Sequence, residues 1–201
     1  TIPAIHALDG PVSFILEWNG LTFAFSSDTF PNKWWMKYTK GADVAVHECF
    51  ITPDDLVKKQ QWTPGAALNV GTQVHTSPAQ FGKVMSDIKP RLAVGYHFFN
   101  DFDTQPNVLA AVRSTYGGPL ALAIDYMVIN VTKDDIRVRM AVIDEDIWPQ
   151  PAVSKKLPPD ANKRIGFSDY ISGGRVPYKD VVEKIYAEIN EKYGTKIKPP
   201  R

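Results

Sequence analysis

Three of the four histidines, with one aspartate, stand where a loop or strand should end: His6, His75, His97 and Asp28. Asp28 directly follows the alternating apolar run "LTFAFSS". Imidazole and carboxylate groups at strand ends are how an α/β scaffold builds a zinc or iron site, because strands are rigid and loops spread the ligands. Two alternatives stay open here. Asp28 could cap a turn or the helix that begins near Pro31, and a lone histidine is often a hydrogen-bonded structural residue.

The elements that would position Asp28 begin with a hairpin. The runs "VSFILEW" and "LTFAFSS" flank Asn19-Gly20, a pair that favours a type I′ turn. A short helix over residues 31–41, ended by Gly41, follows. The next segment, "ADVAVHECF", is almost continuously apolar, so we expect a strand buried on both faces.

Two Thr/Ser-Pro pairs mark helix starts in the middle of the chain. Thr52-Pro53 opens a helix through residue 60, and Ser77-Pro78 opens another that Lys89-Pro90 ends. Between them we predict a glycine-bearing loop, residues 63–73, that leads to His75.

The following segments continue the alternation. The apolar run "RLAVGYHFF" reads as a buried strand whose end carries His97. A helix near residues 105–118 and a last pair of strands, 119–131 and 136–143, follow it. Buried strands that alternate with helices, between hairpins at both ends, predict an α/β domain with a mixed sheet.

The amino-acid composition changes from about Trp148. Residues 148–177 are rich in Pro, Gly and Ser without periodicity, and we interpret them as an extended arm. The final segment, 178–194, places an apolar stripe on one side of a helix that docks on the body or on a partner subunit. We therefore divide the chain into a main unit, 1–147, and an arm with a docking or oligomerisation helix, 148–201. The stripe consists of Val181, Val182, Ile185, Tyr186 and Ile189.

The composition limits the function classes. The chain has 201 residues, is 44% hydrophobic and carries a net charge of +1, so nothing indicates a nucleic-acid partner. No apolar run approaches the roughly 20 residues of a membrane helix. The first residues lack both a signal-peptide pattern and an initiator Met, so we expect that something upstream was removed. These features predict a soluble protein and leave a cytoplasmic or periplasmic location open.

The order of these motifs resembles the second half of the metallo-β-lactamase superfamily, with the closest likeness to its ribonuclease Z and arylsulfatase-like branch. The resemblance covers about residues 3–143 and implies an αββα sandwich, of which this chain is the C-terminal half. It implies that Asp28, in "SSDT", bridges two metals, although the family's usual Gly is Ser27 here. It also implies that His6 binds the first metal and His97, in "GYHFF", the second.

Two further motifs of the resemblance imply catalytic support. The pair His47-Glu48 matches the family's "HEA" element, and "HTS" at His75 matches its "HST" element. By this likeness His75 donates a proton to the leaving group and Glu48 orients it. One shared anionic ligand would offset the repulsion between two cations, which is the role we expect for Asp28.

The family signature H-x-H-x-D-H is not found in the sequence. We expect that it belongs to a missing N-terminal half of the same fold, and a degenerate relative that lost its metal is the alternative. A chain without that half would expose a sheet edge and a core face, and would be stable only beside the half or in a homo-oligomer.

The sequence therefore predicts a metal-dependent hydrolase with one or two zinc ions, iron or manganese being alternatives. A metal-bound hydroxide would attack a small ester-like, phosphoester, sulfate ester or activated aryl-halide substrate. The competing hypothesis is a non-catalytic binding or scaffold subunit that holds a partner through the arm and helix.

Some residues near the motifs allow two structural interpretations. Asn100, Asp101 and Asp103 could line a pocket, but capping of the following helix is favoured. Trp34, Trp35 and Trp62 could form an aromatic slot, with core packing as the default.

Overall fold

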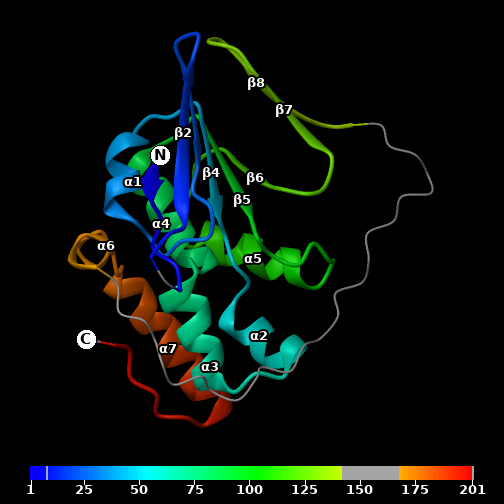
Figure 1. Cartoon of the computed structure of the whole chain (residues 1–201). Helices are drawn as coiled ribbons and strands as arrows, with labels where there is room; N and C mark the ends of the chain where they lie inside the picture. The colour runs from blue at the N-terminus through cyan, green and yellow to red at the C-terminus, as the bar shows by residue number, and fades with distance from the viewer. Residues whose placement is uncertain (8, 142–167, 201) are drawn as a thin grey trace.

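The computed structural model describes residues 1–7, 9–141 and 168–200. A six-stranded sheet with strand order β1-β2-β3-β4-β5-β6 forms its centre (Figure 1). The first three strands pair antiparallel and β3 to β6 pair parallel, so the predicted α/β class with a mixed sheet is confirmed. The strands are β1 Ile2–Pro3, β2 Val12–Trp18, β3 Leu21–Phe25, β4 Val44–Glu48, β5 Leu92–Tyr96 and β6 Leu120–Leu122.

The β2–β3 hairpin has the predicted turn. Trp18 pairs with Leu21, and Asn19 and Gly20 have φ values of 52° and 72°. Positive φ at both central residues defines a type I′ turn, whose twist matches the strands. Because the register is fixed, Ile15 lies opposite Ala24 on one face of the sheet, and Phe14 lies opposite Phe25 on the other.

Helices α1 Lys33–Tyr38, α4 Pro78–Ile88 and α5 Thr104–Arg113 cover the face that carries Ala24. Trp35 of α1 and Phe81 of α4 are fully buried against small strand residues such as Ala45. Helix α4 starts at Ser77-Pro78 as predicted, and Ser77 also forms a capping box with Gln80. Helix α1 ends at Tyr38, before the predicted Gly41, and the Thr39 hydroxyl donates to the Trp35 carbonyl there.

The predicted loop 63–73 is wrong. Helix α2, Pro53–Gln60, is followed by α3, Pro64–Asn69, and by a π-helical turn η1, Val70–Val74. Thr63 is the N-cap of α3 and Pro64 is its first helical residue. This is the same Thr-Pro signal that starts α2. The two glycines of this segment suggested a loop, but the cap and the packing of Leu68 against the C-terminal helix decide for helix.

The predicted strand 119–131 is two strands. Its first part is β6, and the chain breaks at Tyr126, whose φ is 65°. The second part, β7 Met127–Val131, pairs antiparallel with β8 Ile136–Met140 in a separate two-stranded sheet. Apolar residues of this hairpin pack on the face of the main sheet opposite the helices. Tertiary packing thus places β6 and β7 in two different sheets, although the apolar pattern of the sequence predicted one continuous strand.

The C-terminal part contributes α6, Asp169–Gly173, and α7, Lys179–Tyr193. Four residues of the predicted stripe are buried, and α7 lies against α3 of the same chain through Leu68 (Figure 1). The predicted extended arm covers residues 148–177. Its part 148–167 and the 147/148 boundary lie outside the described residues, and in the remaining part residues 169–173 form α6, capped by Ser168, where an extended segment was expected. Within the described part, none of the helices has the length and apolarity to cross a membrane.

Candidate metal centre

All five predicted site residues come together at the carboxyl ends of the parallel strands. Asp28 follows β3, Glu48 is the last residue of β4, and His97 follows β5 directly. Parallel strands point their carboxyl ends to one edge of a sheet, so three segments far apart in sequence meet there. His6, after β1, and His75, after η1, approach the same place from two loops.

Asp28 is held by His97. His97 Nδ1 donates to Asp28 Oδ1 at 2.7 Å, and this bond lowers the pKa of Asp28 although burial opposes it. Burial lowers the pKa of His97, but the bond and the charges of Asp28 and Glu48 outweigh it, so the pKa is raised. Helix α1 is capped by Asn32, so Asp28 is not its cap.

The backbone beside this pair adopts unusual conformations. His97 has φ 73° and Ser27 has φ 56°, in the left-handed region that favours glycine. Ser27 occupies the position at which the family that the sequence resembles usually has Gly. The Ser27 hydroxyl donates a hydrogen bond to the Val12 carbonyl at 2.7 Å. Non-glycine residues persist in such conformations where the surrounding structure fixes them, and these positions cluster at functional sites.

Glu48 fixes the position of His75. Glu48 is fully buried, and its Oε2 lies 2.7 Å from His75 Nδ1. Its Oε1 accepts from the backbone amides of Thr29 and Thr76, so both oxygens are engaged. Burial raises the pKa of Glu48 well above its usual value. Burial, and then the charge of His97, lower the pKa of His75 to about 4.

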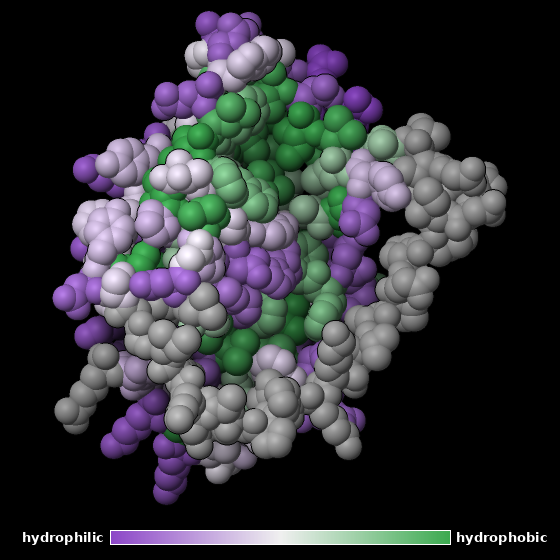
Figure 2. Space-filling view, viewed as in Figure 1, coloured by the Kyte–Doolittle hydropathy of each residue, from purple (hydrophilic) through white to green (hydrophobic). Residues whose placement is uncertain are grey.

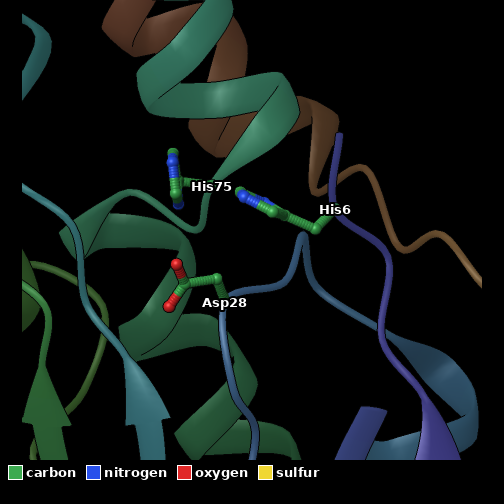
Figure 3. A group of neighbouring side chains, drawn as sticks. All are labelled: His6, Asp28 and His75. Atoms are coloured by element: carbon green, nitrogen blue, oxygen red, sulfur yellow. The ribbon is translucent and has the colours of Figure 1, made fainter. Parts of the chain in front are cut away.

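His6 completes the cluster (Figure 3). Its ring lies 4.7 Å from that of His75, and the two side chains converge with the Asp28 carboxylate. The buried His6 Nδ1 has no hydrogen-bond partner among the described residues. Burial and the charge of His75 lower the pKa of His6, which favours the neutral imidazole that a metal requires.

These residues fit a metal ion. One ligand atom from each of His6, Asp28 and His75 lies within 4.8 Å of the others, and so do the atoms of Glu48, His75 and His97. Imidazole nitrogens and carboxylate oxygens suit zinc, iron and manganese. An imidazole nitrogen buried without a partner is costly in a folded protein, and a bound cation would satisfy it.

His75 lies between the two groups. The resemblance implied a proton-donor role for His75 and metal binding by His6, Asp28 and His97, but neither donor group contains those three ligands together. In the structure the ring of His75 is 5.1 Å from that of His97 and belongs to both groups. The division of roles between ligand and proton donor stays a prediction.

The fourth histidine has a structural role. His47 is fully buried, its Nδ1 bonds the Glu48 carbonyl at 2.8 Å, and its ring contacts Trp35 edge-on. Burial lowers the pKa of His47 to about 4, so the ring is neutral near pH 7.

Sequence reasoning missed three supports of the site. Phe50 stacks on His75 with centroids 4.3 Å apart and contacts His97 with its edge. The Thr76 hydroxyl donates to the Thr29 carbonyl, and the Thr29 hydroxyl accepts from the amide of Ile5, which anchors the segment of His6. The sequence offered one sign of these two threonines: Thr29 directly follows Asp28, and Thr76 directly follows His75.

The residues with two readings are now placed. Asp103 is the N-cap residue of α5 but its side chain makes no capping bond, and Asp101 Oδ1 instead accepts from the amides of Asp103 and Thr104 at the start of the helix. Trp35 is in the core, and Trp62 packs beside Ile51 and Leu56. Trp34 stacks on Tyr170 of α6 at 5.2 Å.

Comparison with known proteins gives only weak likenesses. No protein-family model matches the chain, and no curated protein matches it. Among solved structures, the metallo-beta-lactamase fold protein YhfI from Bacillus subtilis is 14% identical, with a TM-score of 0.45 over 61% of this chain and 45% of that one. A proposed metal-dependent hydrolase from Parabacteroides distasonis is 18% identical, with a TM-score of 0.38 over 60% of this chain and 47% of that one.

The chain spans less than half the length of both structures. The first is named for the fold of the family that the sequence resembles, and the second is named only as a metal-dependent hydrolase. Similarities of this size do not assign the chain to that family.

Proposed function

We propose that this chain carries the metal centre of a metal-dependent hydrolase of metallo-β-lactamase-like fold. The observation that carries the proposal is the convergence of His6, Asp28, Glu48, His75 and His97 from separate segments onto one edge of the sheet. The buried His6 Nδ1, which has no hydrogen-bond partner among the described residues, is compatible with a cation at this place.

In this proposal His6, Asp28 and His97 hold the metal, zinc in the first instance, with iron or manganese as alternatives. When bound, such a cation lowers the pKa of a coordinated water and polarises the bond to be cleaved. Asp28 supplies the negative charge, and its second oxygen is not committed to His97 Nδ1.

His75 and Glu48 act on protons. Because Nδ1 of His75 is committed to Glu48, the other ring nitrogen, Nε2, is the one available to a substrate. Glu48 is itself fixed by two backbone amides, so the ring has one preferred orientation. His75 would deliver the proton on Nε2 to the leaving group while Glu48, whose pKa is raised by burial, gives its own proton to Nδ1, so that the ring stays neutral and Glu48 ends as a carboxylate.

The substrate class is an ester-like compound, a phosphoester, a sulfate ester or an activated aryl halide. The net charge of +1 does not favour a polyanionic substrate such as a nucleic acid. The stacked rings of Phe50 and His75 form an aromatic wall beside the cluster, which suits a flat leaving group.

The test begins with metal. The purified protein is stripped with a chelator, reloaded with zinc, iron or manganese, and analysed for bound metal and for hydrolysis of nitrophenyl esters, phosphodiesters and sulfates. We expect about one to two ions per chain and activity that depends on them.

A protein that binds no metal, and whose stability a chelator leaves unchanged, would instead be a binding or scaffold subunit. Metal bound without hydrolysis of the panel would support the metal centre and refute the proposed substrate classes.

A further inference from the structure

Residues 168–176, the C-terminal segment below, lie beside the candidate metal centre, whose five side chains all come from the first half of the chain. Ile171 of α6 packs in one buried cluster with Ile5 and Phe30. Ile5 directly precedes His6, and the Ile5 carbonyl accepts from the Phe30 amide at 2.6 Å. Figure 3 shows the brown C-terminal ribbon beside the loop of His6.

The C-terminal segment also pairs with the backbone that follows Asp28. Residues 174–176 run antiparallel to residues 31–33, with a bridge between Arg175 and Asn32. Two amide-to-carbonyl hydrogen bonds, of 2.6 and 2.9 Å, flank this bridge. The backbone of Arg175 is therefore fixed next to the loop of Asp28.

The side chain of Arg175 joins two loops of the centre. Its guanidinium carbon Cζ lies 3.8 Å from the centroid of the Phe30 ring, where a cation is attracted by the aromatic face. Its Nη2 donates to the Gln73 carbonyl at 3.1 Å and lies 3.4 Å from Gln73 Oε1. Phe30 comes two positions after Asp28, and Gln73 comes two positions before His75. One side chain thus connects the loop of Asp28 with the loop of His75.

The Gln73 carbonyl depends on a donor from outside its own helix. It belongs to the last turn of η1, where the carbonyls find no later amide of the same helix. The preceding carbonyl, of Thr72, accepts from Gln80 Nε2. Arg175 supplies a donor for Gln73 and so fixes the end of the turn that leads to His75.

The outer side of the C-terminal segment faces solvent. Asp169 and Ser172 are exposed, whereas Ile171 is 5% exposed. The surface at the left of Figure 2, where Figure 1 places α6, is mainly purple or pale, that is, hydrophilic. The side chains of Ile171 and Arg175 therefore contact the loops of the centre from a segment whose other side is polar.

We propose that Arg175 is a positioning residue of the metal centre, which holds the loop of His75 against the loops of His6 and Asp28. The inference rests on the proposed function, since it requires a cation among these loops. Donor groups that are fixed before the metal arrives lose less conformational freedom when they bind it. Arg175 therefore raises the metal affinity without touching the ion.

The test measures the zinc affinity of the whole chain by competition with a chromogenic chelator. We expect Arg175→Ala to lower this affinity by about 10–100-fold, as loss of a residue that orients metal ligands does. Arg175→Lys should fall between this variant and the wild type. Lysine keeps the charge but lacks the planar group that stacks on Phe30 and donates to Gln73 at the same time.

Arg113→Ala is the matched control. Arg113 also donates to a carbonyl beyond a helix end, that of Gly118 at 2.6 Å. Helix α5 leads from the carboxyl end of β5 to the start of the parallel strand β6, so Arg113 lies at the opposite edge of the sheet from the centre. We expect this variant to bind zinc as the wild type does.

Cobalt(II) gives a second measurement, because its visible absorption depends on the geometry of its ligands. We expect the spectrum of cobalt-loaded Arg175→Ala to differ from that of the wild type, and the spectrum of Arg113→Ala to match it. A residue that only stabilised the fold would leave the spectrum unchanged. Circular dichroism verifies that each variant is folded, and Arg175→Lys decides the question if Arg175→Ala is not.

Three outcomes would overturn the inference. Wild-type zinc affinity and cobalt spectra in both Arg175 variants would overturn it and leave the proposed function intact. An equal loss of affinity in Arg113→Ala would overturn it as well, because general destabilisation would then explain the effect. A wild-type chain that binds no zinc, iron or manganese would overturn the proposed function and this inference with it.

Discussion

His97 Nδ1 and Asp28 Oδ1 lie 2.7 Å apart, although 69 positions separate them in the chain. They follow β5 and β3, which are not neighbours in the sheet, because β4 lies between them. The hydrogen bond therefore spans the end of β4, directly beside Glu48, whose Oε2 lies 3.9 Å from His97 Nδ1. The centre of the candidate site is this contact across three strands.

Asp28→Asn tests the role of the carboxylate. The amide keeps the size of the side chain but removes the negative charge, so we expect metal affinity to fall by about 100-fold or more. The measurement is competitive titration of zinc against a chromogenic chelator. The control is Asp87→Asn, since Asp87 accepts a hydrogen bond from Tyr178 outside the cluster. Equal zinc affinity in both variants would show that Asp28 is not a metal ligand.

His75→Ala tests the proton-donor role. We expect turnover to fall by about 10²–10⁴-fold while the metal content stays unchanged. The substitution leaves a space beside Phe50 and Glu48, so added imidazole should restore part of the turnover. Loss of metal from this variant would make His75 a ligand, as its membership in both donor groups allows.

Gly82→Ala tests the contact between α4 and α5. A Cβ at Gly82 would lie 2.1 Å from Thr115 Oγ1 and 2.7 Å from the Val112 carbonyl oxygen, so the two helices must separate. We expect a loss of about 1–3 kcal/mol in the free energy of unfolding, measured with urea. Gly117→Ala is the control, because nothing lies within 4 Å of its Cβ. An undiminished stability in Gly82→Ala would mean that the helices do not pack this closely.

Asp54 makes the docking of α7 dependent on pH. Burial raises the pKa of Asp54, but hydrogen bonds from Lys192, Lys58 and Tyr193 outweigh it, so the pKa is lowered in the folded chain. A lowered carboxyl pKa stabilises the fold above the unfolded value of about 3.9, and the stabilisation is lost as pH falls through the folded value.

The measurement compares the wild type with Asp54→Asn. Because the contacts are partly exposed, we expect the variant to be less stable by about 1 kcal/mol or less at pH 7. The difference should shrink below about pH 4 as the wild-type carboxyl takes up a proton. A difference that is the same at pH 7 and pH 3 would rule out this contribution.

Local chemistry in the sequence determined much of the fold. Asn19-Gly20 specified its turn, and Thr52-Pro53 and Ser77-Pro78 specified helix starts, because these effects depend on residues within four positions of one another. The sequence also supplied the donor types of the candidate site, since few side chains suit a transition metal.

Tertiary structure decided what depends on distant partners. The break at Tyr126, which moves β7 and β8 off the central sheet, follows from packing on Val44 and Leu92, and no local signal reveals it. The position of His75 between both donor groups likewise depends on the π-helical turn η1 and on Glu48, 27 positions away. A sequence fixes which groups are present, but only the long-range pairing of β3, β4 and β5 sets the distances between them.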